Sequence, residues 1–282
     1  MKKLTEYLQF IKKYGPYALV AGGSDGLGAA FANALAGRGM NLVLIARDKD
    51  RLEKTAANIR EKFSVDVFTI AADLADYENA KNKINALLSE EKKISIGLLV
   101  YNAAFAPIAL FENTSEEHLA LAAAVNVKAP LLLAKFLSGA MITRKRGGII
   151  LMSSLAGAQG SPKLAAYAAT KAFNAVLAEG LWKELKPHSI DVLGCCAGAI
   201  LTPGYEESQL KQRAEKNKQG PVLKPAPGTM KAKDVAEKAL KALGKGPIVV
   251  PGSINKIARF FLTRLLTRKA AINIMSMNTG SL

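Results

Sequence analysis

The sequence has few of the residues from which metal centres and disulfide frameworks are built. It contains two cysteines, the adjacent Cys195 and Cys196, and two histidines, His118 and His188, which lie far apart. Two cysteines in a chain of 282 residues form no disulfide framework and are typical of a reducing compartment, so we expect a cytoplasmic protein. Neither histidine belongs to a ligand-like spacing pattern, and no metal site is expected.

Long hydrophobic runs are missing as well. The longest stretch without charge, residues 94–111, contains Asn102 and Pro107 and is better explained as a strand and a loop than as a membrane span. Charged residues within the first thirteen positions interrupt any apolar signal-peptide core. We therefore expect neither a membrane-spanning segment nor a signal peptide.

Aromatic residues are scarce, at 6% of the chain, whereas positive charge is abundant, with a net charge of +16 at pH 7. The basic residues are spread along polar helix faces, with denser groups at both ends and in 211–245, and aromatics do not interleave them. This pattern is unlike that of a single-strand nucleic-acid binder, so no nucleic-acid partner is expected. A basic surface suits ligands that carry phosphate groups.

The dominant pattern in the sequence is a regular alternation of apolar runs with helical stretches. Several apolar runs are continuous rather than alternating, as expected of strands that helices cover on both faces. The alternation predicts an α/β fold, a single domain over 1–282 with one doubly wound, mostly parallel, seven-stranded sheet and helices on both faces. The predicted strands are Tyr17–Ala21, Asn41–Ala46, Val65–Ile70, Gly97–Tyr101, Gly147–Met152, Ile190–Cys195 and Pro247–Val250, with helices near 26–38, 49–63, 76–91, 115–142, 163–187 and 232–243.

Three segments depart from this alternation. Residues 1–15 are predicted to form a short amphipathic helix that Gly15-Pro16 ends. The Gly- and Pro-rich segment 198–230 follows the carboxyl end of a strand and predicts a substrate lid, with a solvated connection as the alternative. The C-terminal extension 253–282 carries a basic amphipathic helix over 254–269. We favour a helix that covers the substrate cleft or a subunit partner, and contact with an anionic membrane surface is the alternative.

A glycine-rich turn, residues 21–28, joins the first predicted strand to the first helix after it. Glycines let the backbone turn tightly and approach a pyrophosphate, which a helix N-terminus attracts through its free N–H groups. The turn therefore predicts a dinucleotide site formed by Gly22, Ser24, Gly26 and Leu27, and a plain tight turn is the alternative.

The second predicted strand ends at Arg47-Asp48, where dinucleotide-binding folds distinguish their cofactors. A carboxylate at this place binds a ribose 2′-hydroxyl, whereas an arginine suits a 2′-phosphate. We favour Arg47 and NADP(H). Asp48 would select NAD(H) if its carboxylate occupied that place, or it caps the following helix.

Polar groups also follow the third and fourth predicted strands. Asp73, followed by Leu74, is expected either to accept a hydrogen bond from an adenine amino group or to cap the helix near Tyr77. Asn102, followed by Ala103, is expected beside the cofactor cleft, where its amide also ties neighbouring strand ends together. Both pairs are predicted to contact the cofactor.

The stretch 153–171 contains the candidate reactive groups. Tyr167 and Lys171 are four residues apart on a predicted helix and so share one face. An ordinary phenol has a pKa of about 10, and a fixed ammonium nearby lowers it, as proton transfer near neutral pH requires. A serine hydroxyl from the preceding strand end would then orient a substrate carbonyl. The alternative is a surface Tyr and Lys on an amphipathic helix.

Asn126 is a further candidate, because it interrupts the apolar helical run 119–127. A buried asparagine needs hydrogen-bond partners, so Asn126 is either a satisfied structural amide or the holder of an ordered water.

Taken together, these residues resemble the short-chain dehydrogenase/reductase family over about residues 15–252. The family's Thr-Gly-x-x-x-Gly-(Ile/Leu)-Gly motif corresponds to residues 21–28, with Ala21 in the threonine place. The family's Asn-Asn-Ala-Gly motif corresponds to residues 101–104. The spacing of thirteen residues to Tyr167 selects Ser154, not Ser153, as the active-site serine.

The resemblance implies a Rossmann-type fold and the roles of the site residues. Tyr167 would be the general acid or base, and Ser154 would bind the reacting oxygen. Lys171 would bind the nicotinamide ribose and lower the Tyr167 pKa, and Asn126 would position a water in a proton relay through Lys171. Ala197 and Gly198 correspond to the family's Pro-Gly motif, with alanine in the place of proline. Thr202 falls where family members contact the nicotinamide amide, so Gly198, Thr202, Tyr167 and Lys171 are also expected to contact the cofactor.

Within the family, the motifs near residues 24–26 and 44–47 are similar to those of NADPH-using ketone and 3-oxoacyl reductases. The resemblance thus implies an NADP(H)-dependent oxidoreductase of a ketone or secondary alcohol, with apolar and acyl substrates among the candidates. It also implies a homodimer or homotetramer. The alternative function is a catalytically silent NADP(H)-binding sensor or scaffold.

Overall fold

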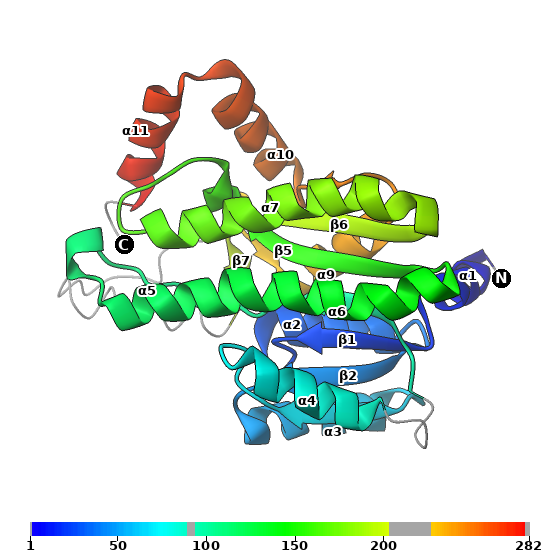
Figure 1. Cartoon of the computed structure of the whole chain (residues 1–282). Coiled ribbons are helices and arrows are strands. Elements are labelled where there is room, and N and C mark those ends of the chain that lie inside the picture. The colour runs from blue at the N-terminus through cyan, green and yellow to red at the C-terminus, as the bar shows by residue number, and fades with distance from the viewer. Residues whose placement is uncertain (1, 89–93, 203–226, 280–282) are drawn as a thin grey trace.

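The seven predicted strands pair into one sheet in the order β3-β2-β1-β4-β5-β6-β9, and all six pairings are parallel. The computed structural model describes residues 2–88, 94–202 and 227–279 (Figure 1). The chain winds outward from β1 in both directions, which confirms the doubly wound fold. The strands are β1 Tyr17–Ala21, β2 Asn41–Ala46, β3 Val67–Ala71, β4 Ile96–Tyr101, β5 Gly147–Ser154, β6 Ile190–Ala197 and β9 Ile248–Val249.

The strand order reverses between β1 and β4. In open parallel sheets, ligands bind beyond the carboxyl ends of the strands at such a point, because the connecting loops diverge there. Two strands are two residues longer than predicted, since β5 and β6 continue in register as far as the pair Ser154 and Ala197. Strand β3 begins at Val67 rather than Val65 and ends at Ala71.

Helices cover both faces of the sheet (Figure 1). One apolar layer packs α2 Gly26–Ala36, α3 Lys49–Lys62 and α9 Ala232–Ala242 against the sheet. The other packs α4 Tyr77–Leu87, α6 Ala129–Arg144 and α7 Ala165–Leu185. This double cover explains the continuous apolar strands, because every strand side chain meets a helix on its own face.

The helix predicted over 115–142 is interrupted. It consists of α5 Glu116–Ala123, a π-helical turn Ala124–Lys128 and α6. The whole segment, Glu116–Arg144, is long and apolar enough to cross a membrane by length and composition, with a mean hydropathy of 1.6. Its α6 part nevertheless packs Leu133, Leu137 and Met141 into the core against the sheet, as a buried helix of an α/β domain does.

The terminal segments extend the α/β body. Helix α1, Lys2–Tyr14, confirms the predicted N-terminal helix. The predicted lid lies mostly outside the described residues, but its two ends, β7 Ile200–Leu201 and β8 Met230–Lys231, pair as a short parallel sheet.

The C-terminal helix predicted over 254–269 is not continuous. Helix α10, Ser253–Phe260, runs into a π-helical turn over Phe261–Leu265, and Leu266 is extended. Helix α11, Arg268–Thr279, then begins in a new direction (Figure 1).

Candidate active site

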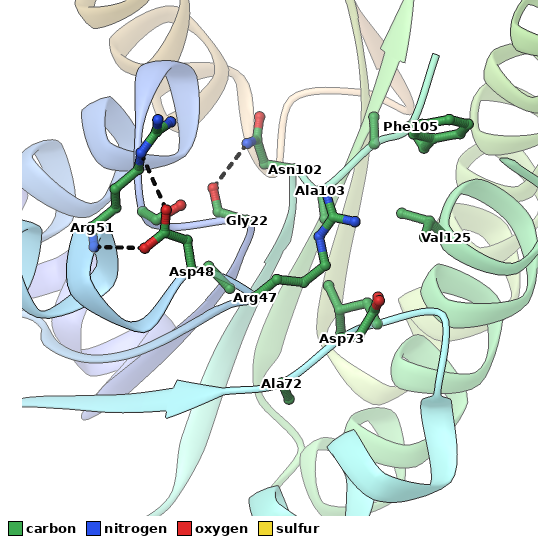
Figure 2. A pocket seen from close by; sticks show the side chains of 14 residues that line it. Gly22, Arg47, Asp48, Arg51, Ala72, Asp73, Asn102, Ala103, Phe105 and Val125 are labelled. Carbon is green, nitrogen blue, oxygen red and sulfur yellow. Dashed lines mark hydrogen bonds and ion pairs between the residues drawn. The ribbon is translucent and has the colours of Figure 1, made fainter. Parts of the chain in front are cut away.

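A cleft of about 530 Å³ opens at the carboxyl ends of β1, β2, β3 and β4 (Figure 2). It lies at the point where the strand order reverses, so the fold places it where a dinucleotide is expected. Seven of the predicted cofactor residues line it: Gly22, Ser24, Arg47, Asp73, Leu74, Asn102 and Ala103.

The glycine-rich turn forms one wall of the cleft. Gly22 has a φ of +78°, which favours glycine, and its amide donates to the Ile45 carbonyl at 2.8 Å. A Cβ at Gly28 would overlap the carbonyl oxygen of Gly22, so only glycine lets helix α2 begin this close to the turn. Gly26 and Leu27 lie in the first turn of α2, behind the cleft lining, and the N-terminus of α2 opens toward the cleft.

Arg47 and Asp48 have different partners at the end of β2. The Asp48 carboxylate accepts from the Arg51 amide at 3.0 Å as the N-cap of α3, and its other oxygen lies 3.2 Å from the Arg51 side chain. Arg47 is exposed, and Figure 2 shows its side chain extending into the cleft. Of the alternatives for Asp48, the structure therefore supports the helix cap. Arg47 is then the charged side chain that extends into the cleft from the end of β2.

Asp73 does not cap the next helix, because Asp76 is the N-cap of α4. The Asp73 carboxylate instead accepts from the Ala75 amide at 2.9 Å and faces the cleft beside Leu74. Asn102 donates from Nδ2 to the Gly22 carbonyl at 3.2 Å and so ties the end of β4 to the glycine-rich turn, as predicted.

The second group of predicted residues lies on β5 and α7. Tyr167 and Ser154 are joined by a hydrogen bond between their side chains, so Ser154 faces the phenol. Ser153 points the other way, is buried and donates to the Lys171 carbonyl at 2.7 Å. The Lys171 ammonium lies 5.5 Å from the centre of the Tyr167 ring and donates to the Met152 carbonyl at 3.1 Å.

The protonation of this pair differs from the prediction. Burial raises the pKa of Tyr167, and the hydrogen bond from Ser154 offsets only part of that increase. Burial lowers the pKa of Lys171 to about 8. The expectation that Lys171 brings the Tyr167 pKa toward neutrality is wrong for this structure, because desolvation of the phenol dominates. The phenol is therefore protonated at neutral pH, which is the form that a proton donor needs.

Asn126 lies in the π-helical turn and is fully buried. Its side chain accepts from the Phe105 amide at 2.8 Å and donates to the Phe105 carbonyl at 2.7 Å. It also donates to Thr170 Oγ1 at 3.1 Å, and Thr170 lies on the helix of Tyr167 and Lys171. The sequence left two roles for Asn126, a structural amide with all its partners or the holder of an ordered water. The structure supports the first role, and the side chain joins the loop after β4 to α7.

Gly198 and Thr202 follow β6 on the far side of the cleft. A Cβ at Gly26 would lie 3.2 Å from the Thr202 methyl group, so Thr202 lies against the start of α2, near the glycine-rich turn. Gly198 packs against the side chain of Asn255. Neither residue lines the 530 Å³ cleft, and neither do Ser154, Tyr167 and Lys171.

The sequence analysis missed two buried amides on or just before α7, Asn174 and Gln159. Asn174 donates to the Asn126 carbonyl at 2.9 Å, while its own oxygen has no partner in the part of the chain that the structure describes. Gln159, just after the 3-10 turn Leu155–Ala158, is buried, and neither polar atom of its amide has a partner among those residues. Asn174 lies one turn after Lys171 on the same helix. One signal in the sequence could have identified it as a candidate: a polar side chain is unusual within an apolar helical run.

The chain is similar to known proteins in sequence and in fold. The family model described as short chain dehydrogenase matches residues 16–213. The chain is 35% identical over 190 residues to a very-long-chain 3-oxoacyl-CoA reductase from Laccaria bicolor, and the match covers 67% of this chain but only 56% of that protein. A solved 7beta-hydroxysteroid dehydrogenase has a TM-score of 0.82 and 25% identity, covering 94% of this chain and 98% of that one.

A short-chain dehydrogenase from Sphingobium yanoikuyae, solved in complex with NADPH, has a TM-score of 0.69 and 29% identity over 84% of this chain and 87% of that one. The order of the strands, the glycine-rich turn and the match to the family model all indicate the same family. The chain belongs to the short-chain dehydrogenase family of oxidoreductases.

Proposed function

We propose that the protein is an NADP(H)-dependent reductase of an apolar ketone. The observation that carries this proposal is the Tyr167 phenol, held between the Ser154 hydroxyl and the Lys171 ammonium. A protein that only bound a nucleotide would have no use for a half-buried phenol with a hydrogen-bonded hydroxyl beside it.

The cofactor assignment rests on Arg47. A 2′-phosphate beside the end of β2 would meet the Arg47 guanidinium, whereas the Asp48 carboxylate that would bind a 2′-hydroxyl is already held by Arg51. A related structure that contains NADPH is consistent with this preference.

The site residues divide the proton chemistry among them. The bound nicotinamide supplies the hydride that the carbonyl carbon receives. Ser154 donates a hydrogen bond to the carbonyl oxygen, and Tyr167 transfers its proton to that oxygen, which becomes the hydroxyl of the product. Lys171, with a pKa of about 8, is mostly charged at neutral pH and stabilises the phenolate that remains.

Tyr167 is protonated at neutral pH in this scheme, because its pKa is not lowered from the ordinary value. A protonated phenol is the form needed to reduce a ketone, whereas oxidation of an alcohol needs the phenolate. We therefore expect reduction at neutral pH and measurable oxidation only at alkaline pH.

The apolar substrate class has two supports. The relatives include a reductase of very-long-chain 3-oxoacyl-CoA and a hydroxysteroid dehydrogenase, both with large apolar substrates. In this chain, the loop that leaves the cleft at Phe105 continues into the exposed apolar side chains of Ile108, Leu110 and Phe111.

The test is the oxidation of NADPH with a panel of small ketones, steroid ketones and 3-oxoacyl thioesters of increasing length. We expect turnover that rises with the apolar size of the substrate and disappears in Tyr167→Phe. Tight NADPH binding without turnover on any substrate would instead support the silent sensor or scaffold.

The cofactor preference is tested with Arg47→Ala. Loss of a charge-assisted contact to phosphate should raise the KM for NADPH by about tenfold to a hundredfold and leave that for NADH nearly unchanged. Lys54→Ala, an exposed cation on α3 outside the cleft, is the matched control. A wild-type protein that prefers NADH would show that the assignment of Arg47 is wrong.

A further inference from the structure

Helix α10 exposes its apolar side instead of burying it. Ile254, Ile257 and Phe260 are 57%, 58% and 55% exposed, whereas the polar Asn255 between them is 4% exposed. Asn255 anchors the helix to the body by donating to the carbonyls of Gly228 and Pro251, each at 2.9 Å. An ordinary surface helix has the opposite orientation, with its apolar stripe against the core.

The exposed stripe continues into the π-helical turn, through Phe261 and Leu265. This part of the chain is held in place, because Arg268 donates to the Ala158 carbonyl at 2.7 Å and Ala271 of α11 is fully buried. Figure 1 shows α10 and α11 standing out from the α/β body. The apolar side chains of α10 and the π-helical turn are called the C-terminal stripe below: Ile254, Ile257, Phe260, Phe261 and Leu265.

Positive charge lies beside the C-terminal stripe, next to Phe260. A groove of about 420 Å³ beside Phe260 is lined by Lys256, Arg259 and Arg264, together with Thr263 and Val250. A second groove shares Val250 and Lys256 with it and adds three more lysines, Lys238, Lys241 and Lys245.

Negative charge is absent from the same part of the sequence. Glu237 is the last acidic residue of the chain, and the 45 residues after it contain eight lysines and arginines. No acidic side chain after Glu237 therefore neutralises the positive charge of this surface.

We propose that the C-terminal stripe docks on the surface of an anionic lipid bilayer. Its apolar side chains would enter the boundary between headgroups and acyl chains, and the cations of the two grooves would contact lipid phosphates. A second copy of this chain fits less well, because a two-fold contact through the stripe would place one group of cations against an identical group. This docking is independent of the reaction proposed for the active site.

The experiment is co-sedimentation of the full chain with phosphatidylcholine vesicles, with and without phosphatidylserine, at low and high salt. We expect binding to the anionic vesicles at low salt and weaker binding at high salt or to neutral vesicles. Absence of binding to the anionic vesicles at low salt would overturn the proposal.

Two variants locate the contact. Ile257→Asp should lower the partition coefficient by roughly tenfold to a hundredfold, because one anchoring side chain becomes charged. Arg264→Ser should lower it by about fivefold, the contribution of one cation near an anionic surface. The matched controls are Leu8→Asp, at an equally exposed apolar position on α1, and Lys54→Ser on α3.

Thermal melting of each variant shows whether it is folded, and light scattering measures its molar mass. Equal loss of binding in Leu8→Asp would refute docking through the C-terminal stripe. So would an Ile257→Asp variant that binds vesicles normally but has a lower molar mass than the wild type, since the stripe would then be a contact between copies. Activity is not used in either measurement, so failure of the proposed reaction would not affect the result.

Discussion

Lys171 is buried, and replacing it should make the protein more stable. Its side chain is 3% exposed, and its ammonium has the Met152 carbonyl as a hydrogen-bond acceptor at 3.1 Å. Burial lowers its pKa from the usual 10.5 to about 8. A shift of this size corresponds to a cost of about 3 kcal/mol for keeping the ammonium charged in the folded protein. Lys171→Met keeps most of the volume and removes that cost.

The lost hydrogen bond to Met152 offsets about 1 kcal/mol, so we expect the variant to be about 2 kcal/mol more stable at neutral pH. The difference should depend on pH. Between pH 8 and 10.5 the unfolded chain holds the lysine proton and the folded protein does not, so the stability of the wild type rises with pH relative to the variant. The rise is at most about 1.4 kcal/mol per pH unit, and the variant's advantage should vanish before pH 10.5.

The assay is urea unfolding of both proteins over that range of pH. Lys183→Met, an exposed lysine on the same helix, is the control and should change the free energy of unfolding by less than about 0.5 kcal/mol at every pH. A difference between wild type and Lys171→Met that is the same at all pH values would refute the reasoning, and so would a variant less stable than the wild type at neutral pH. Turnover should be lost in this variant, because the phenolate loses its ammonium.

Two further substitutions test an ion pair between α9 and the end of α2, and the glycine-rich turn at the cleft. Glu237→Ala should lower the free energy of unfolding by about 2 kcal/mol in urea titrations, because Glu237 binds the buried Arg38 guanidinium through two hydrogen bonds of 3.0 and 2.7 Å. An unchanged urea midpoint would mean that Arg38 finds another partner. Gly28→Ala should weaken NADPH binding by about tenfold or more in fluorescence titrations, because the new methyl group pushes α2 away from the Gly22 carbonyl. Unaltered affinity would show that the glycine-rich turn does not contact the cofactor.

The fold could be predicted because its main signals are local. Continuous apolar runs marked strands covered on both sides, and the helical stretches between them allowed only parallel pairing. The ends of the strands were harder to predict, because they depend on pairing with the neighbouring strand. Ser154, for example, belongs to β5 because it pairs with Ala197 of β6. The break at Leu266 was missed because Thr263, Arg264 and Leu265 still follow a helical pattern, and only the backbone reveals the π-helical turn.

The residues of the site could be predicted from residue types at fixed spacings. The pKa values and hydrogen-bond partners of those residues could not. The spacing of Tyr167 and Lys171 placed them on one helix face, yet the direction of the Tyr167 pKa depends on burial, which spacing does not report. Whether Asp48 binds a ligand or caps a helix depends likewise on the position of the Arg51 side chain. Asn174 was missed because its partner is a main-chain carbonyl that is exposed only where the helix widens into a π-turn.

The pairing of Asn126 with Phe105 has a consequence for how this protein can change over evolution. The asparagine amide both donates to and accepts from the Phe105 main chain, as a neighbouring strand would, and so fixes the loop that follows β4 at this residue. The segment before Phe105 is thereby held beside the cleft, while the segment after it, with the exposed Ile108, Leu110 and Phe111, is next tied to the body at Ala109, whose amide donates to the Lys163 carbonyl at 3.1 Å. We therefore expect insertions and deletions after Phe105 to reshape the exposed apolar side of this loop while its cleft side keeps its geometry. One buried side chain marks the boundary between these two parts.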